Sequence, residues 1–224
     1  MNKTITGIIL AAGSSNRYGK GNKILEKINN KEVLLYSLEV FVNNNFIDNI
    51  VITVKKEDYE LIDRIIKKNN YNKEISIVIG GNSRKESVYN AIKSIDSDVV
   101  VIHDAARPLI KDSYINECIN NIKKYKGVSI GVKAKDTIKI VDSNNIVVNT
   151  TSRDNTYLIQ TPQCFDRKLL LELHKKYENE SVTDDCMLLE KDGYDIKVID
   201  GDYSNIKITY YDDLNIVKYY IDNM

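Results

Sequence analysis

The chain has no tryptophan and only two prolines, two histidines and three cysteines among its 224 residues. The cysteines Cys118, Cys164 and Cys186 are widely spaced and odd in number, which excludes a disulfide scaffold or a CxxC zinc site and favours a reducing compartment. Two histidines exclude a histidine-rich metal centre. No apolar run approaches the ~18–20 residues that a membrane span requires, and the first residues do not follow the signal-peptide pattern. We therefore expect a cytoplasmic protein without a membrane partner.

The chain also lacks an excess of charge of either sign. Its 32 Lys and Arg residues balance 32 Asp and Glu residues. A net charge of zero creates no general field for a polyanion, so nucleic acid is not an expected partner. With 42% hydrophobic residues there is enough apolar surface for a sizeable core. The length favours a single domain over residues 1–224.

Short β-branched runs alternate with amphipathic segments along most of the chain. The runs are continuously apolar, as in a mostly parallel sheet that is covered by helices on both faces. The alternation favours an open α/β fold, whose ligands bind at the carboxyl ends of the strands. Expected strands are 5–10, 49–54, 75–79, 98–102, 128–132 and 196–199, and expected helices are 33–42, 58–68, 85–95, 167–177, 184–191 and 212–221.

The middle of the chain departs from this alternation. Residues 137–141 and 146–151 indicate two strands joined by a polar turn at 142–145, with no adjacent helix to cover them. An uncovered hairpin is marginally stable in water. We therefore interpret residues 134–156 as a projecting arm that pairs with a second copy of the chain. The alternative is a solvated surface hairpin.

A glycine loop follows the first strand. The small residues Ala12 and Gly13 let a ligand lie against the backbone, whose N–H groups can donate to a phosphate, a ribose or a base. Arg17, Lys20 and Lys23 come next, and such cations suit a polyphosphate. The spacing matches neither GxGxxG nor the Walker pattern. An ordinary strand-to-helix turn with solvated cations is the alternative.

A second motif ends the strand at 98–102 with HDAARP. An Asp at this place, Asp104, is suited to hold a metal or hydroxyl groups, and Arg107 either neutralises it or binds a substrate phosphate. Buried charges are costly unless they are paired, so a structural Asp–Arg pair is the alternative. His103 is interpreted as a packing residue.

Three further polar clusters complete the pattern. In GGNSRKESV, the glycines permit close approach of a ligand, and Ser83 is an expected helix cap with Glu86 three residues later. Ser87, one turn into the helix, is placed to face the same ligand. The alternative is a capped helix that is entered through a flexible turn. Lys207 interrupts an alternation of Ile and Thr near the end of the chain. A lysine at the end of a strand is usually exposed, so Lys207 is of interest only if it points at the same anion as the loop cations. Thr183 and the two aspartates after it are interpreted as a helix N-cap.

Taken together, these motifs resemble the 2-C-methyl-D-erythritol 4-phosphate cytidylyltransferase family. The motifs are AAG–R–YG–NK, GGNSRKESV, HDAARP, DTIK, TTSRD, QTPQ, TDD and NIKIT, and they occur in the family's order over residues 7–221. The resemblance implies a Rossmann-like nucleotide-diphospho-sugar transferase fold with a dimerising hairpin arm. It implies CTP and a polyol phosphate as substrates, a homodimer, and Mg²⁺ carried by the CTP phosphates, with Asp104 as a contact through water.

The resemblance also implies roles for individual residues. Those implied for the triphosphate are Gly13, Arg17, Lys23 and Lys207. Those implied for cytosine and ribose are Ala12, Gly81, Asn82, Ser87 and Ala105, with Asp104 on the CTP side as well. Those implied for the methylerythritol phosphate are Asp104, Arg107, Thr161, Thr183 and Lys207. Thr137 and Arg153, on the arm, would reach the substrate phosphate in the partner subunit. We expect Arg17, Lys23, Arg153 and Lys207 to be the catalytic residues.

Two departures and three rival functions remain open. The family commonly has Pro-Lys-Gln around the loop lysine, where this chain has Asn22, Lys23 and Ile24, and Tyr18 replaces the usual Met. A ribitol 5-phosphate cytidylyltransferase is the nearest rival, although Ala106 and Asp185 favour the erythritol enzyme. A transferase that uses UTP or another nucleotide is a broader rival. A nucleotide sensor without catalysis is a rival from another class.

Overall fold

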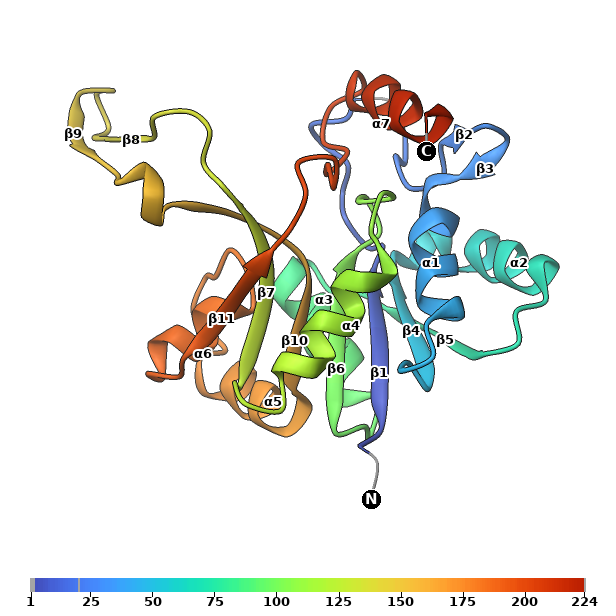
Figure 1. Cartoon of the computed structure of the whole chain (residues 1–224). Helices are drawn as coiled ribbons and strands as arrows, with labels where there is room; N and C mark the ends of the chain where they lie inside the picture. Colours follow the sequence, from blue (N-terminus) through green and yellow to red (C-terminus); the bar gives the residue numbers. More distant parts are fainter. Residues whose placement is uncertain (1–2, 20, 224) are drawn as a thin grey trace.

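The computed structural model, which describes residues 3–19 and 21–223, is built on a seven-stranded sheet (Figure 1). In spatial order the strands are β11 (Ile196–Asp200), β7 (Gly127–Lys133), β10 (Tyr157–Asp166), β6 (Val99–Asp104), β1 (Ile5–Leu10), β4 (Asn49–Val54) and β5 (Glu74–Ile79). Neighbouring strands are parallel except for β10, which runs antiparallel to both β6 and β7. The expected open and mostly parallel sheet is therefore confirmed.

Helices cover both faces of this sheet. One apolar cluster contains side chains of α1 (Val33–Asn43), α2 (Tyr59–Asn69), α4 (Asp112–Asn121) and α7 (Asp213–Asp222). The other contains side chains of α3 (Arg84–Lys93), α5 (Arg167–Lys176) and α6 (Cys186–Lys191). Along β6, Val99 and Val101 join the first cluster, whereas Val100 and Ile102 join the second. Burial on both faces explains why the strands read as continuous apolar runs.

The expected strands and helices are present with ends that differ by no more than two residues. None of the helices within residues 3–19 and 21–223 is both long and apolar enough to cross a bilayer. Several elements were not predicted. They are strand β10, helix α4, the small hairpin of β2 (Lys27–Ile28) and β3 (Lys31–Glu32), and the short 3-10 helices η1 (Lys56–Asp58) and η2 (Arg153–Asn155).

Strand β10 escaped prediction because its sequence carries the signals of a loop. Thr161, Pro162 and Gln163 form a polar run with a proline, and proline normally argues against a central strand. The structure accommodates it through a shift in the pairing with β7 between Ile159 and Gln163. Helix α4, in contrast, carries a helical signal that we did not use, because its buried residues are Tyr114, Ile115, Cys118 and Ile119.

The expected hairpin arm is also present. Strands β8 (Lys139–Val141) and β9 (Val147–Thr150) pair only with each other in the described structure, and every residue in them is exposed. The short 3-10 helix η2 (Arg153–Asn155) leads from the arm back to β10. Figure 1 shows the arm standing away from the sheet at the upper left.

The order of the strands creates a crevice at one edge of the sheet. The chain passes from β1 to β4 and β5 on one side, and then crosses to β6 on the other side of β1. In open α/β sheets ligands bind where the strand order reverses in this way. Because β10 is antiparallel, its first half, with Gln160 and Thr161, lies at this edge as well.

Candidate active site

A cavity of about 880 Å³ lies at the carboxyl ends of β1, β4, β5 and β6. It is lined by the loops that follow these strands and by Lys207 from the segment after β11. Expected site residues at its wall are Ala12, Gly13, Arg17, Lys23, Gly81, Asn82, Ser87, Asp104 and Lys207. The fold therefore brings together the glycine loops, the loop cations and the strand-end Asp, which are far apart in sequence.

The loops after β1 and β5 touch each other closely. A Cβ atom on Gly80 would lie 2.4 Å from the Cβ of Ala12 and 2.9 Å from the Oγ of Ser87. Only glycine allows this approach without a shift of the neighbours. A Cβ atom on Gly13, in contrast, would meet nothing within 4 Å, so the backbone there faces open space. The two loops thus form one continuous backbone surface.

The start of α3 holds the second loop in shape. Ser83 caps the helix by accepting a hydrogen bond from the N–H of Glu86 at 3.1 Å, as expected. The Glu86 carboxylate accepts from the N–H of Asn82 at 2.7 Å. The Oγ of Ser87 accepts from the N–H of Gly81 at 3.0 Å and donates to the carbonyl of Ser83. Ser87 therefore orders the loop from within.

The unusual residues beside Lys23 anchor that lysine at the cavity. The side chain of Asn22 donates to Asp58 at 2.7 Å, and Ile24 is buried in the core. Burial lowers the pKa of Lys23, and the positive charges of Lys207 and Arg17 lower it further. The three cations therefore face the same space. Lys20 lies outside the described residues.

Asp104 carries a buried carboxylate that is surrounded by three cations. Its Oδ2 lies 2.6 Å from the Lys207 ammonium and 3.9 Å from the Nε of Arg107, and its Oδ1 lies 3.6 Å from the Nε of Arg84. Burial by itself would raise the pKa of Asp104. The positive charges of Lys207, Arg84 and Arg107 outweigh that effect and hold the pKa well below its usual range.

The segment after β11 carries Lys207 to this carboxylate. Asn205 is fully buried, and its Nδ2 donates to Gln160 and to the carbonyl of Thr161 at 3.2 and 3.0 Å. The guanidinium of Arg107 donates to the carbonyl of Asn205 at 2.8 Å. The hydrogen bonds of Asn205 thus fix the segment that carries Lys207. This segment is not a strand in the structure.

A chain of hydrogen bonds supports Asp104 from behind. The backbone N–H of Asp104 donates to the Oγ1 of Thr161 at 3.1 Å, and this hydroxyl lies 2.9 Å from the Nδ1 of His103. The Nε2 of His103 lies 3.1 Å from the carbonyl of Arg107, which requires a donor there. We therefore assign the proton to Nε2, so that Nδ1 accepts from Thr161. His103 is completely buried, which is consistent with its interpretation as a packing residue.

Six expected site residues lie in the described parts of the chain without lining the cavity. Thr137 and Arg153 are exposed on the arm, and Thr183 is exposed with its hydroxyl on the sulfur of Met187. The other three, Ala105, Arg107 and Thr161, lie behind the wall around Asp104. Their proposed contacts with substrate stay predictions.

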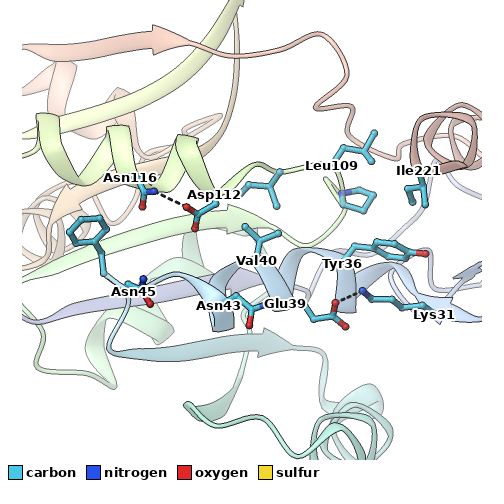
Figure 2. A pocket seen from close by; sticks show the side chains of 13 residues that line it. Lys31, Tyr36, Glu39, Val40, Asn43, Asn45, Leu109, Asp112, Asn116 and Ile221 are labelled. Atoms are coloured by element: carbon cyan, nitrogen blue, oxygen red, sulfur yellow. Dashed lines mark hydrogen bonds and ion pairs between the residues drawn. The ribbon is translucent and has the colours of Figure 1, made fainter. Parts of the chain in front are cut away.

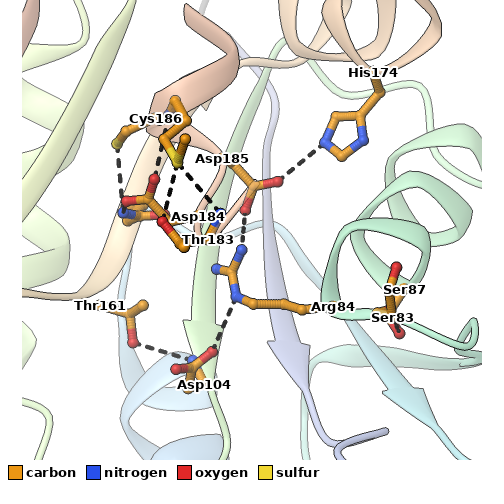
Figure 3. Close-up of polar contacts among 12 residues, drawn as sticks. Ser83, Arg84, Ser87, Asp104, Thr161, His174, Thr183, Asp184, Asp185 and Cys186 are labelled. Atoms are coloured by element: carbon orange, nitrogen blue, oxygen red, sulfur yellow. Dashed lines mark hydrogen bonds and ion pairs between the residues drawn. The ribbon is translucent and has the colours of Figure 1, made fainter. Parts of the chain in front are cut away.

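Sequence reasoning missed several functional candidates. Arg84, Lys55 and Lys56 line the cavity, and none of the three was singled out. The two lysines directly follow strand β4, so the signal was a pair of cations at the carboxyl end of a strand next to β1. Arg84 stands between two residues that we had noted, Ser83 and Ser87, and reaches Asp104 across the sheet edge (Figure 3).

The N-cap expected before α6 is correct for one residue and wrong for another. Asp184 accepts a hydrogen bond from the N–H of Met187 at 3.2 Å and so caps the helix. Asp185 makes no cap and is completely buried instead, with its carboxylate on Arg84 and His174 (Figure 3). A long-range ion pair replaces the local contact that the sequence favours.

A second hollow of about 570 Å³ lies between α1, α4 and the end of α7 (Figure 2). Its polar side chains pair with one another, since Lys31 binds Glu39 and Asn116 donates to Asp112 at 2.7 Å. None of the expected site residues, all of which lie in the described parts of the chain, lines it. The cationic cavity is therefore the candidate active site.

The buried state of His103 predicts a loss of stability in mild acid. Burial lowers the pKa of His103 from 6.5 to about 4. Between these pH values His103 is protonated in the unfolded chain but neutral in the native protein, so acid favours unfolding. The stabilisation is complete above pH 6.5 and decreases as the pH falls towards 4. Between pH 6.5 and 4.5 the free energy of unfolding should fall by about 2–3 kcal/mol.

Urea unfolding at several pH values measures this loss in the wild type and in a His103→Gln variant. The variant cannot titrate in this range and should lose much less between pH 6.5 and 4.5, even if it starts from a lower stability. Equal losses in both proteins would contradict the assignment to His103.

Known proteins of one family are similar to this chain over nearly its whole length. A model of the 2-C-methyl-D-erythritol 4-phosphate cytidylyltransferase family matches residues 5–223. Proteins of that name from Clostridium beijerinckii and Clostridium tetani are 40% and 44% identical, over 98% and 96% of this chain and 99% and 89% of theirs.

A solved structure gives the same result. The crystal structure of a 4-diphosphocytidyl-2C-methyl-D-erythritol synthase from Anaerococcus prevotii has a TM-score of 0.89 and 35% identity, and the match covers 99% of this chain and 100% of that one. The expected nucleotidyltransferase fold is confirmed. On the strength of the family model and of these relatives, the chain belongs to the 2-C-methyl-D-erythritol 4-phosphate cytidylyltransferase family.

Proposed function

We propose that the cationic cavity joins CTP to 2-C-methyl-D-erythritol 4-phosphate, giving 4-diphosphocytidyl-2-C-methyl-D-erythritol and pyrophosphate for isoprenoid precursor synthesis. The observation that carries this proposal is the meeting of Arg17, Lys23 and Lys207 at one cavity with two glycine loops. A reaction between two anionic substrates needs such a concentration of positive charge. The remaining task of the protein is to align the two substrates for reaction.

The two glycine loops divide the recognition of CTP between them. The loop after β1, with Gly13 and Arg17, faces the triphosphate together with Lys23 from the same connection between β1 and β2. The loop after β5, with Gly81 and Asn82, faces the base and presents its backbone to cytosine. Exposed backbone donors and planar cations are the groups that phosphates and bases bind.

The reaction is an in-line displacement at the α-phosphorus of CTP. A phosphate oxygen of the acceptor forms the new P–O bond, and the bond from the α-phosphorus to the bridging oxygen breaks as pyrophosphate leaves. The protein aligns the two anions and neutralises the charge that develops between them. Lys23 and Lys207, which both line the cavity, supply that charge. No nucleophilic side chain is required.

A divalent cation such as Mg²⁺ fits this cavity as a partner of the CTP phosphates. Within residues 3–19 and 21–223, no cluster of three or more His, Cys, Asp or Glu side chains could hold an ion alone. Mg²⁺ is commonly held by one carboxylate together with substrate phosphates and water. Asp104 is the carboxylate that we propose for this contact, through water. The ion would neutralise phosphate charge.

The arm makes the proposed enzyme a homodimer. Ile140, Ile146 and Val148 are 47, 63 and 61% exposed on the hairpin of β8 and β9, which has no cover within the described chain. Such a hairpin gains stability by packing against a second copy. In that arrangement Thr137 and Arg153 reach the acceptor phosphate in the partner's cavity. We also propose a cytoplasmic location, because the three cysteines are buried free thiols.

Pyrophosphate release from the purified protein with CTP and Mg²⁺ tests the proposed function. Methylerythritol phosphate should support release, and ribitol 5-phosphate should not. Release with ribitol 5-phosphate alone would move the enzyme to teichoic acid synthesis, and release with UTP instead of CTP would replace the nucleotide. Binding of CTP without release with either acceptor would favour the sensor.

Lys23→Ala should lower kcat by about 10²–10³, because its ammonium meets charge that develops in the transition state. Its folding stability should change little, since the lowered pKa of Lys23 means that its charge is disfavoured in the native protein. Steady-state kinetics and thermal unfolding measure the two effects. Lys67→Ala, at an exposed site on α2, is the control and should keep both values. Equal losses of turnover and stability in Lys23→Ala would make the lysine structural.

Arg153→Ala should impair the use of the acceptor while the affinity for CTP stays nearly intact. If the arm acts in the partner's cavity, mixing Arg153→Ala chains with Lys23→Ala chains restores one working site in each heterodimer. Random mixing should then recover about a quarter of the wild-type activity per chain. Activity no higher than the mean of the two variants would place Arg153 in its own subunit's site, and weak CTP binding by Arg153→Ala would overturn its assignment to the acceptor.

A further inference from the structure

A line of buried charges runs from the cavity wall into the protein behind Asp104. Arg84, the first residue of α3, points its Nε at Asp104 over 3.6 Å and donates from Nη1 to the Oδ2 of Asp185 at 2.5 Å (Figure 3). Asp185 is completely buried, whereas a quarter of the Arg84 side chain is exposed at the cavity. One guanidinium therefore joins a carboxylate of the candidate site to a carboxylate in the interior.

A histidine on α5 completes the line. The Nε2 of His174 lies 3.0 Å from the Oδ1 of Asp185, and only 2% of the residue is exposed. Its Nδ1 is buried and has no partner among the described residues. The proton therefore belongs on Nε2, where it is donated to the carboxylate. Both oxygens of Asp185 are thereby occupied, and the carboxylate has one fixed orientation.

One further charge lies beside this carboxylate. Asp184 precedes it in the chain, accepts from the Nε2 of Gln163 at 2.7 Å and adds to the attraction on Arg84. Burial by itself would raise the pKa of Asp185, but the positive charge of Arg84 and the hydrogen bond from His174 hold it below its usual range. Asp185 is therefore ionised at neutral pH, and it holds Arg84 by a full charge.

We propose that Asp185, oriented by His174, is a positioning residue that fixes Arg84 and, through Arg84, the carboxylate of Asp104 at Lys207. This inference rests on the proposed function, because it concerns the cation and carboxylate that we place in the active site. None of the three residues behind Asp104 is required to touch a substrate. Their effect is to hold Asp104 in one of its rotamers.

The placement of this pair indicates a role beyond stability. A buried ion pair is often no more stabilising than apolar residues of similar volume. The chain has a second long-range pair, in which the buried Arg167 donates to Asp96 at 2.6 Å and to the carbonyl of Ser97 at 3.0 Å, while the Asp96 side chain is exposed to solvent. That pair lies before the amino end of β6, whereas Arg84 meets β6 at its carboxyl end. We therefore expect substitutions at Arg167 and Asp96 to affect folding, and substitutions at Arg84 and Asp185 to affect the positioning of Asp104.

A double variant, Arg84→Met with Asp185→Leu, tests the proposal without leaving a buried charge unpaired. It should stay folded, with kcat lowered about 10–100-fold and the Kd for CTP changed less than about threefold, because alignment is lost rather than binding. The control, Arg167→Met with Asp96→Ala, should lose stability and keep kcat. A double variant that is folded and keeps kcat would overturn the proposal.

The donor of His174 is tested by a pair of substitutions. His174→Gln keeps an N–H group for Asp185 and should keep kcat within about threefold, whereas His174→Phe fills the space without a donor and should lower kcat about tenfold. Both variants should bind CTP as the wild type does. Equal kcat values in the two variants would overturn the orienting role of His174.

Crystal structures of the variants give a readout that does not depend on turnover. In the double variant at Arg84 and Asp185, the 2.6 Å contact between Asp104 and Lys207 should be lost or the Asp104 carboxylate should be rotated, while the control keeps both. An unchanged contact overturns the positioning role, whatever reaction the wild type catalyses. A wild type that releases no pyrophosphate refutes the proposed function alone.

Discussion

The structure around the cavity depends on the burial of one negative charge. An ionised carboxylate away from water costs several kcal/mol unless cations and hydrogen bonds compensate it. Asp104 is compensated by Arg84, Arg107 and Lys207, which come from the start of α3, from its own turn and from the segment after β11. That single requirement holds two distant parts of the chain, the start of α3 and the segment after β11, at the carboxyl end of β6. The hydrogen bond from its N–H to Thr161 adds the antiparallel strand β10.

Asp104 does not neutralise all of the positive charge at the cavity. Lys207 is shared between Asp104 and the open space, whereas Lys23 faces that space and has its pKa lowered by burial and by the neighbouring cations. A native site that disfavours its own positive charge is one that an anion stabilises on binding. The positive charges of Lys23 and Arg17 at the cavity therefore favour the binding of phosphates, and the glycine loops leave room for phosphates to approach the backbone. This imbalance supports the proposal that the cavity binds anionic substrates.

Local sequence patterns predicted the sheet, most of its helices and many of the loop residues that line the cavity. Continuous apolar runs indicated the parallel strands, and the Ser83 cap was visible from residues three apart. Contacts between distant residues were not visible. Arg84 and Asp185 are 101 residues apart, so the sequence shows an exposed helix start and a cap where the structure has a buried ion pair. Strand β10 was missed for a related reason, because Pro162 and its polar neighbours become a strand only where β6 and β7 pair with both sides.

The ionisation of Asp104 is the central claim of this account, and carbon-13 NMR of its side-chain carboxyl group measures it directly. An Asp104→Asn variant identifies the signal, and the methyl spectrum of the same sample shows that the protein is folded. At pH 3.8, where an ordinary aspartate is half protonated, the Asp104 signal should still be that of a carboxylate, because its three cations hold the pKa below the usual range. A midpoint at or above pH 3.8 in the folded protein would contradict the account.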